Sequence, residues 1–460
     1  NEAVPVPLDM DVYQPVGDTE TNRPLVLVFH TGNFLPHPQN GSPNGTRKDS
    51  AVVDVCTKLT KKGYVVASCD YRLVWAPTAT DKTTRVFTLI NAAYRGVQDA
   101  RTAIRFFKRD VNENANSFGI DPSKIVLWGI GAGGYITLNS AALDNYLKIP
   151  TASNGKFVTV IGGQTVPMVI PAVNGDIYGT SVGVVPPGYP GFPAGDTLNY
   201  PNHLGYDSDF ALCVNMGGAL ADTAWIDPGQ VPLIAFHCPY DPNAPYKQGI
   251  VKVPVNPPLD VVEVQGSYLA TKLSEQYGNN ASFSSVDFKD PVSTVANTRN
   301  DGISSLYPIY GTGGAFDSSP WDFWASDNPN NANGLATNPN MSPEKARSYI
   351  DSILTFYAYR ACYALDLDCK SNSTKDQLSD LQVGLKFGPS PAANQVSFTT
   401  NAEYPVKDVY VYDVQGRLVK AKTNINSNNY VLERFSLPSG NYLVNLIFKE
   451  GIVTKQITFK

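Results

Sequence analysis

Residues 125–134 of the chain read IVLWGIGAGG. The four apolar residues at 125–128 have the length and composition of a buried strand, and the small residues behind them open a helical pattern that extends over 132–147. A strand that passes into a helix through so few residues must turn sharply at Gly131. The segment therefore predicts a strand, a tight turn and a helix, one directly after another.

The same alternation continues along the chain in both directions. Apolar runs typical of buried strands lie at 25–29, 64–69, 211–216 and 232–237. Amphipathic patterns typical of helices lie at 50–62, 92–108 and 342–365. Strands that alternate with helices form a mostly parallel sheet covered by helices on both faces. We therefore predict the α/β fold class for residues 1–370.

Two long segments of this domain lack clear periodicity. Residues 150–206 are rich in Gly, Pro, Tyr and Asn, and residues 279–341 are similarly irregular. Ligands of α/β sheets bind outside the carboxyl ends of the strands, where such insertions act as lids or walls. We therefore expect residues 150–206 to lie over the cleft.

The composition changes after about residue 370. Short strands with alternating apolar residues are predicted at 406–413, 430–435 and 442–449, and Gly- or Pro-containing turns separate them. This pattern predicts a small all-β sandwich. The predicted organisation is an α/β domain at 1–370, a linker at 371–382 and a β domain at 383–460, and 460 residues are too many for one core.

Composition and charge exclude several classes of partner. The net charge of −5 leaves no basic surface for nucleic acid or for an anionic membrane. The sequence contains no run of about 18 apolar residues, so no membrane-spanning helix is predicted. The low charged fraction of 17% suits an extracellular protein, and a start at Asn1 fits a chain whose signal peptide has been removed.

The cysteines leave disulfides possible without requiring them. Their even number permits pairing, Cys362 and Cys369 are close enough in sequence to bridge one loop, and Cys213 and Cys238 fall on strands expected to be neighbours. The alternative is that all of them are buried free thiols. No Cys-x-x-Cys spacing indicates zinc.

Three segments together resemble the α/β-hydrolase-fold carboxylesterases, over about residues 8–365. They are VFHTGNF at 28–34, the IVLWGIGAGG segment, and FHCPYDPNAPY at 236–246. The resemblance implies that Gly131 occupies the position of the nucleophile and Asp241 that of the triad acid. It also implies that Thr31, Gly32 and Ala132 form the turn whose backbone amides bind an oxyanion.

The chain departs from this family at two positions that the chemistry requires. Gly131 supplies no nucleophilic oxygen, and no histidine follows Asp241, because the four histidines are His30, His37, His203 and His237. A serine hydroxyl needs an imidazole as its base. In the loop at 310–321, Asp317 is the sole proton acceptor, and His203 is a candidate displaced base. We therefore predict vestigial positions and no functional catalytic residue.

Other residues are candidates for ligand contact rather than for chemistry. Aromatic side chains at predicted strand ends and loops are expected to rim the cleft, with core packing as the alternative; they are Phe34, Tyr71, Trp75, Trp225, Tyr240 and Tyr246. The Asn-rich run at 327–333 does not match a calcium loop. No cofactor and no metal are expected.

The last 75 residues resemble the type A sorting domain of type IX secretion cargo. The resemblance rests on VYVYDVQGRLV at 409–419 and LPSGNYLV at 437–444, with turns at Asp413, Gly416, Pro438 and Gly440. It implies export through the periplasm and across the outer membrane to the cell surface or the medium. It also implies recognition of residues 383–460 by the outer-membrane shuttle and translocon of that system.

The sequence leaves three functions open. The first is a non-catalytic secreted protein that uses a hydrolase scaffold for binding or display. The second is an esterase or related acyl hydrolase whose nucleophile was replaced by Gly131. The third is a surface adhesin or a component of gliding motility.

Overall fold

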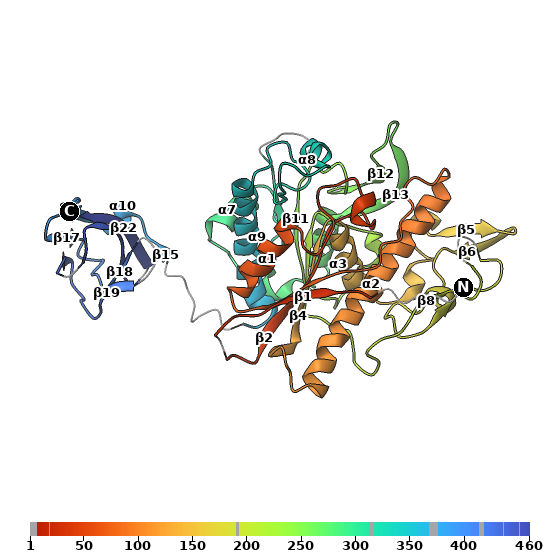
Figure 1. Cartoon of the computed structure of the whole chain (residues 1–460), viewed down its shortest axis with the longest axis horizontal. Helices are drawn as coiled ribbons and strands as arrows, with labels where there is room; N and C mark the ends of the chain where they lie inside the picture. Colours follow the sequence, from red (N-terminus) through yellow and green to blue (C-terminus); the bar gives the residue numbers. More distant parts are fainter. Residues whose placement is uncertain are drawn as a thin grey trace. The chain divides into compact units, whose positions relative to one another are not determined.

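The structure is a computed structural model that describes residues 7–17, 19–189, 193–311, 317–367, 376–413, 418–435, 437–449 and 451–460. The chain divides into two compact units, Asn1–Leu367 and Asp368–Lys460 (Figure 1). Each unit has its own hydrophobic core.

The first unit is built on a seven-stranded sheet with the order β1-β3-β2-β4-β9-β11-β14. The strands are β1 Met10–Tyr13, β2 Arg23–Phe29, β3 Val65–Cys69, β4 Ile120–Ile130, β9 Leu212–Met216, β11 Leu233–His237 and β14 Leu306–Pro308. All neighbouring pairs are parallel except β1 with β3. The predicted α/β class with a mostly parallel sheet is confirmed.

The central strands are apolar throughout because both faces of the sheet are covered. On β2, Leu25, Leu27 and Phe29 join one core, and Val26 and Val28 join the other. One core contains residues of the helices α2 Lys82–Glu113, α3 Ala132–Ala142 and α5 Ser267–Gln276. The other contains residues of α1 Ser50–Thr60 and α9 Pro343–Ala364. Figure 1 shows α1 and α9 on one side of the sheet and α2 and α3 on the other.

Two helices differ in length from their sequence patterns because of capping residues. The helix expected at 92–108 begins ten residues earlier, where Asp81 accepts a hydrogen bond from the Thr84 amide. The helix expected at 132–147 ends at Ala142, and Asn145 caps a separate turn, η2 Tyr146–Lys148. Local hydrogen bonds of short polar side chains thus decide where these helices start and stop.

The insertion at 150–206 packs along α2, and none of its described residues lines the cleft, which corrects the expected position. Its elements are η3 Ser153–Gly155, β5 Val158–Ile161, β6 Gln164–Pro167, α4 Pro171–Asn174, β7 Gly183–Val184 and β8 Thr197–Asn199. Polar side chains of α2 hold it by donating to its backbone carbonyls. Gln98 Nε2 donates to Asn174 and Asp176, and Arg101 Nη1 donates to Ile177. The periodicity of α2 does not reveal these long-range bonds.

A β-hairpin that the sequence patterns missed lies between β11 and α5. It consists of β12 Gln248–Val253 and β13 Leu259–Gly266, and β13 also pairs with β10 Ala219–Leu220. The segment expected to be irregular at 279–341 contains β14 and three short helices, α6 Ala281–Ser284, α7 Pro291–Asn297 and α8 Asn331–Thr337. The remaining short helices are η1 His37–Gln39 and η4 Thr223–Trp225.

The second unit has a five-stranded sheet, β15-β22-β21-β18-β19, and a three-stranded sheet, β16-β17-β20. Its elements are β15 Asp376–Gln377, α10 Asp380–Val383, β16 Lys386–Gly388, β17 Gln395–Thr399, β18 Asp408–Asp413, β19 Leu418–Lys422, β20 Asn429–Glu433, β21 Gly440–Ile447 and β22 Gly451–Phe459. Apolar side chains from both sheets form one core. The predicted all-β C-terminal domain is confirmed.

Most cysteines are buried free thiols. Cys56, Cys69, Cys213 and Cys238 are free, so the considered pair of Cys213 and Cys238 is not formed. Cys362 in α9 is disulfide-bonded, and Cys369 lies outside the described residues. Within the described ranges, no helix is both long enough and apolar enough to cross a bilayer.

The attachment of the insertion to α2 can be tested at Arg101, whose side chain is 4% exposed and also donates to the carbonyl of Leu143. Arg101→Met leaves buried carbonyl oxygens without donors, which should lower the free energy of unfolding by about 1–3 kcal/mol. Denaturant melts and limited proteolysis within residues 150–206 measure the effect. Lys82→Met, at an exposed position of the same helix, is the matched control and should change neither. Equal effects of the two variants would contradict the assignment.

Candidate functional site

The turn between β4 and α3 has the backbone of a nucleophile elbow. Gly131 has φ 56° and ψ −113°, and its amide donates to the carbonyl of Met216 at 2.8 Å. The first turn of α3 lies so close to the sheet that only glycine fits: a Cβ on Gly133 would be 2.0 Å from the Phe29 oxygen, and one on Gly134 would be 2.3 Å from Asn215 Oδ1. Close packing therefore requires the glycines of the motif.

The side chain of Thr31 occupies the place that a side chain at position 131 would take. A Cβ built on Gly131 would be 2.2 Å from Thr31 Oγ1 and 2.9 Å from Thr31 Cβ. The second distance involves the branch point of a β-branched side chain, so a χ1 rotation of Thr31 does not remove the overlap. Gly131 and Thr31 thus fit each other, and a serine at position 131 does not fit beside this threonine.

The predicted oxyanion turn has positive φ at three successive residues. Gly32, Asn33 and Phe34 all have positive φ, at 123°, 57° and 55°. The Thr31 carbonyl oxygen lies 2.5 Å from His30 Nδ1 and 3.3 Å from Tyr71 Oη. In a trans peptide the next N–H points away from the carbonyl, so the Gly32 amide is directed away from these two groups. The Ala132 amide, the first of α3, has no acceptor inside its helix.

His30 orients this turn and is not a base. Its ring is buried and stacks on Tyr71 with ring centres 4.6 Å apart. Burial lowers the pKa of His30 to about 4, so the imidazole is neutral, and Nδ1 donates its proton to the Thr31 carbonyl. Tyr71, predicted as a ligand contact, is buried beneath the turn, where its hydroxyl also donates to the His30 carbonyl at 2.9 Å.

The Asn-rich run supports the loop that packs behind the turn. A Cβ on Gly32 would be 3.0 Å from Gly45 Cα, so residues 37–46 lie directly against Gly32. Side-chain amides hold this loop by donating to its carbonyls: Asn333 to Gly41 at 2.9 Å, Asn330 to Ser42 at 3.1 Å and Asn328 to Pro43 at 3.3 Å. The run thus has a structural part in shaping the site.

Asp241 follows β11 as the acid of the site. Its Oδ1 accepts hydrogen bonds from the amides of Asn243 at 2.7 Å and Ala244 at 3.0 Å. Its Oδ2 lies 3.7 Å from His237 Nε2. Burial raises the pKa of Asp241 to about 7. A buried carboxyl in this range changes its charge near neutral pH.

His237 does not serve as the missing base. Its Nε2 is 3.0 Å from the Ala244 carbonyl, to which it donates, and its Nδ1 is 2.6 Å from Ser267 Oγ, from which it accepts. Burial lowers the pKa of His237 to about 4. Both ring nitrogens are therefore occupied in the core of the fold.

A cleft of about 590 Å³ opens at these elements. Of the predicted site residues, the structure brings together Thr31, Gly32, Phe34, Trp75, Gly131, Ala132 and Asp241 in its lining. Trp321 also lines the cleft, and a Cβ on Gly217 would be 3.5 Å from the Trp321 ring and 3.8 Å from Asp241 Oδ2. The indole of Trp321 and the Asp241 carboxyl thus both lie close to Gly217.

Four predicted aromatic contacts lie elsewhere. Tyr71 is under the oxyanion turn, and Trp225 packs on Phe157 while its Nε1 donates to the Lys148 carbonyl at 2.8 Å. Tyr240 is 60% exposed with its ring against Tyr310, and Tyr246 packs between His237 and Tyr268. A position at a strand end does not specify which way a side chain points.

Several lining residues were missed by the sequence patterns. They are Tyr135, Val251, Lys252, Val253, Trp321 and Asp322. Alternation on either side of Asn256-Pro257 was the available signal for the hairpin that carries Val251, Lys252 and Val253. No sequence pattern marked Asp322 as a residue of the cleft. It is buried, and burial followed by the Asp49 carboxylate raises the pKa of Asp322 to about 7.

The remaining candidates lie outside the cleft. His203 packs on Phe106 of α2 beside Arg109, so it is not a displaced base over the site. Cys238 is buried, and burial raises its thiol pKa well above the usual range. Asp317 is buried beside Gly311.

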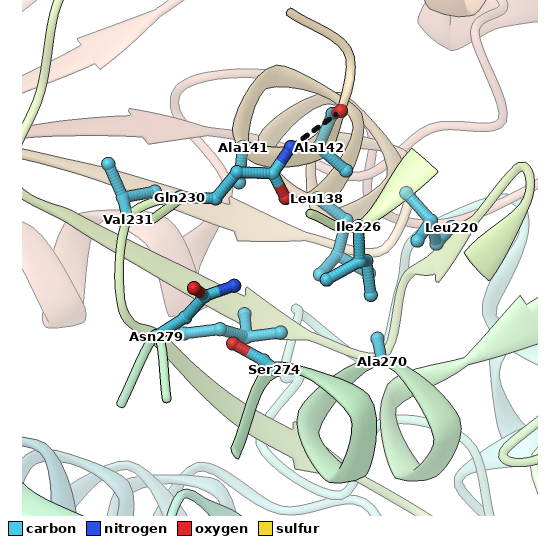
Figure 2. Close-up of a pocket in the computed structure, with 11 residues that line it drawn as sticks. Leu138, Ala141, Ala142, Leu220, Ile226, Gln230, Val231, Ala270, Ser274 and Asn279 are labelled. Carbon is cyan, nitrogen blue, oxygen red and sulfur yellow. Dashed lines mark hydrogen bonds between the residues drawn. The ribbon is translucent and has the colours of Figure 1, made fainter. Parts of the chain in front are cut away.

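A second cavity, of only about 20 Å³, lies away from the elbow between α3 and α5. Figure 2 shows its mostly apolar lining and the hydrogen bond from the Gln230 amide to the Ala142 carbonyl. Its volume is close to that of a single water molecule, so it is not a ligand site.

The predicted turn residues of the second unit fall at strand ends. Asp413 ends β18, Gly440 begins β21 with φ 152°, and the Pro438 carbonyl accepts a hydrogen bond from Tyr442 Oη at 2.8 Å. Gly416 lies outside the described residues.

The fit between Gly131 and Thr31 can be measured by a double-mutant cycle. Gly131→Ala places a Cβ in a strained backbone and against Thr31, so it should cost about 2–4 kcal/mol of unfolding free energy. Adding Thr31→Gly removes the overlap but not the strain, so the pair should be less destabilised than the sum of the single variants by about 1–2 kcal/mol. Gly63→Ala is the matched control, because Gly63 has φ 94° and no neighbour near its Cβ position; it should add independently to Thr31→Gly.

The charge of Asp241 gives a pH-dependent prediction. An unfolded Asp titrates near pH 4, whereas the folded pKa is about 7, so the ionised form is the unfavourable one and stability falls as pH rises between these values. Asp241→Asn removes this loss. Relative to the unsubstituted chain, its free energy of unfolding should rise by about 2 kcal/mol from pH 5 to pH 8. Denaturant melts at both pH values test this; a pH-independent difference would contradict it.

Two family models match separate segments of the chain, one in each compact unit. The BD-FAE family model matches residues 10–161, which include the oxyanion turn and the elbow, while Asp241 lies beyond the match. The model of the secretion system C-terminal sorting domain matches residues 386–460. No curated protein matches the chain.

The similar solved structures include esterase 2 of the planctomycete Thermogutta terrifontis. Its propionate-bound form is 16% identical, with 76% of this chain and 90% of that chain covered and a TM-score of 0.32. Its paraoxon-phosphorylated form is 17% identical, with 72% and 86% covered and a TM-score of 0.33. Its apo form is 19% identical, with 52% and 70% covered and a TM-score of 0.29.

The family matches agree with the resemblances drawn from the sequence at both ends of the chain. A sorting domain of this kind directs a protein to the cell surface or into the medium. The chain is therefore similar to the BD-FAE family over residues 10–161 and to the secretion system C-terminal sorting domain over residues 386–460.

Proposed function

We propose that the α/β unit is a non-catalytic binding domain, which the sorting domain delivers to the cell surface or the medium. The observation that carries this proposal is the contact between Thr31 and the Cβ position of residue 131. It means that the place of the nucleophile is filled by another residue. The chemistry of the elbow is absent while its backbone is retained.

The surroundings of the acid support the same conclusion. Acyl transfer by a serine needs a histidine between nucleophile and acid, and no histidine lines the cleft. Trp321, which like Asp241 lies close to Gly217, has an indole that donates a hydrogen bond but accepts no proton. Asp241 alone has neither a nucleophile to activate nor a relay to pass a proton.

The features that remain are those of a binding site. The cleft is large enough for a small molecule and combines apolar walls with a few polar groups. The amides of Gly32 and Ala132 still offer donors for an acceptor atom. These groups require no reaction in order to hold a ligand.

The alternative of an esterase inactivated by a substitution at Gly131 is disfavoured by the same contact. Removal of a serine side chain leaves an empty space at the elbow. Here the space is occupied by Thr31, at a position where the family has a small glycine. Because residues 31 and 131 both differ from the family and fit each other, they favour a fold that has lost nucleophilic catalysis.

The proposal also names the proteins that would recognise the sorting domain during export. Residues 383–460 would be recognised by the outer-membrane shuttle and translocon of the type IX system, in keeping with the sorting-domain match. The α/β unit then reaches the cell surface or the medium as the cargo.

Hydrolysis of p-nitrophenyl acetate tests the absence of catalysis. The unsubstituted chain, Gly131→Ser, and Gly131→Ser combined with Thr31→Gly should all show no turnover above a heat-unfolded sample. The third variant makes room for the serine but still lacks a base. Melting curves establish that each variant is folded, and an active serine esterase assayed in parallel is the positive control.

Two results would contradict this proposal. Turnover by the unsubstituted chain at about 1 s⁻¹ or faster, a typical enzymatic rate, would show a nucleophile and base at other positions. Turnover by the doubly substituted chain alone would show a working base near Asp241 and favour an esterase that lost its serine.

A further inference from the structure

We propose that the cleft binds an organic ammonium group, held by Asp241 and by the aromatic rings around it. This inference rests on the proposed binding function and specifies the chemistry of its ligand.

Asp241 has one oxygen free to accept a hydrogen bond. Its side chain is 3% exposed, and both of its backbone hydrogen bonds go to Oδ1. Among the described residues, none donates a hydrogen bond to Oδ2; the nearest cation candidate is His237 Nε2 at 3.7 Å, which already donates to the Ala244 carbonyl. A buried carboxylate oxygen gains a large stabilisation from a charged donor.

A second buried carboxyl in the lining would also be stabilised by a positively charged donor. Asp322 lines the cleft and hydrogen-bonds to neutral partners, Ser319 and Asn44, while Asp49 behind it adds another negative charge. The cation in the described lining is Lys252, which is 54% exposed and lies 3.7 Å from Asp260 on the hairpin. The inner part of the cleft therefore becomes negative as these two carboxyls ionise, and low-dielectric walls strengthen that potential.

Aromatic rings complete a site for an organic cation. Trp321 and Asp241 both lie close to Gly217, and Phe34, Trp75 and Tyr135 line the same cleft. Ring faces attract ammonium groups, and more strongly where water is excluded. Among the described residues, no three Asp, Glu, His or Cys side chains converge as a metal site requires, so a cation with an apolar body fits better than a metal ion.

The pH dependence follows from the groups that face Asp241. They are His237, which is neutral near pH 7, Tyr135 and Cys238, whose hydroxyl and thiol pKa values are raised by burial, and the amides of its own loop. Beyond Cys238 lie Asp317 and Lys345, which also act on that thiol. Asp241 and Asp322, each with a pKa of about 7, are therefore the carboxyl groups whose ionisation an ammonium ligand in the cleft favours. Affinity should rise with pH, by up to about tenfold per pH unit below 7.

Three probes of similar shape test the ligand chemistry on the full chain: benzylammonium, benzyl alcohol and benzoate, titrated calorimetrically at pH 6 and pH 8. Benzylammonium should bind at least tenfold more tightly than the other two at pH 8, and more weakly at pH 6. N-acetyl-lysine methylamide, in a parallel arm, separates a polypeptide-borne ammonium from a free amine; binding of either form supports the proposal.

Variants locate the site. Asp241→Asn should lower the affinity for benzylammonium at least tenfold and weaken its pH dependence, with melting curves showing that it is folded. Asp287→Asn removes a carboxylate that is 72% exposed and outside the cleft, and it should change nothing. Failure of both ammonium probes to bind, equal binding of benzyl alcohol, tighter binding of benzoate or an undiminished affinity in Asp241→Asn overturns the inference. Ester turnover would instead overturn the proposed function, whatever the ammonium probes do.

Discussion

The close contact between the first turn of α3 and the strands beneath it determines the geometry of the whole site. Gly129, Gly133 and Gly134 allow backbone to approach backbone at distances that no side chain tolerates. This contact places the amino end of α3, the carboxyl end of β4 and the turn after β2 together, because Phe29 is in register with Gly129. The cleft exists because these three main-chain segments meet.

The same contact separates shape from chemistry. Glycines at 129, 133 and 134 are needed for packing, so they persist whether or not the elbow carries a nucleophile. Position 131 is different, because its side chain would point away from the packing interface toward Thr31. A motif of this kind therefore indicates a fold with much greater certainty than it indicates a reaction.

Much of the architecture could be predicted from the sequence, and less of the site. The buried strands were recognisable because both of their faces are covered, which gives continuous apolar runs such as 25–29. Thr31, Gly131 and Asp241 could be placed because each follows such a strand. Trp321 and Asp322 could not, since they come from an irregular segment whose path depends on amides such as Asn338 Nδ2, which donates to the Asp322 carbonyl. The insertion was misplaced because hydrogen bonds from α2 to distant carbonyls leave no periodic pattern.

The attachment of that insertion has a consequence for how its surface can vary. The hydrogen bonds that Gln98, Arg101 and Arg105 donate to it end on main-chain oxygens, such as the carbonyls of Asp176 and Ile177. A carbonyl is present whichever residue occupies the position. The outer side chains of the insertion are thus free to diverge while its backbone remains anchored, so an exported protein can change the face it presents without rebuilding its scaffold.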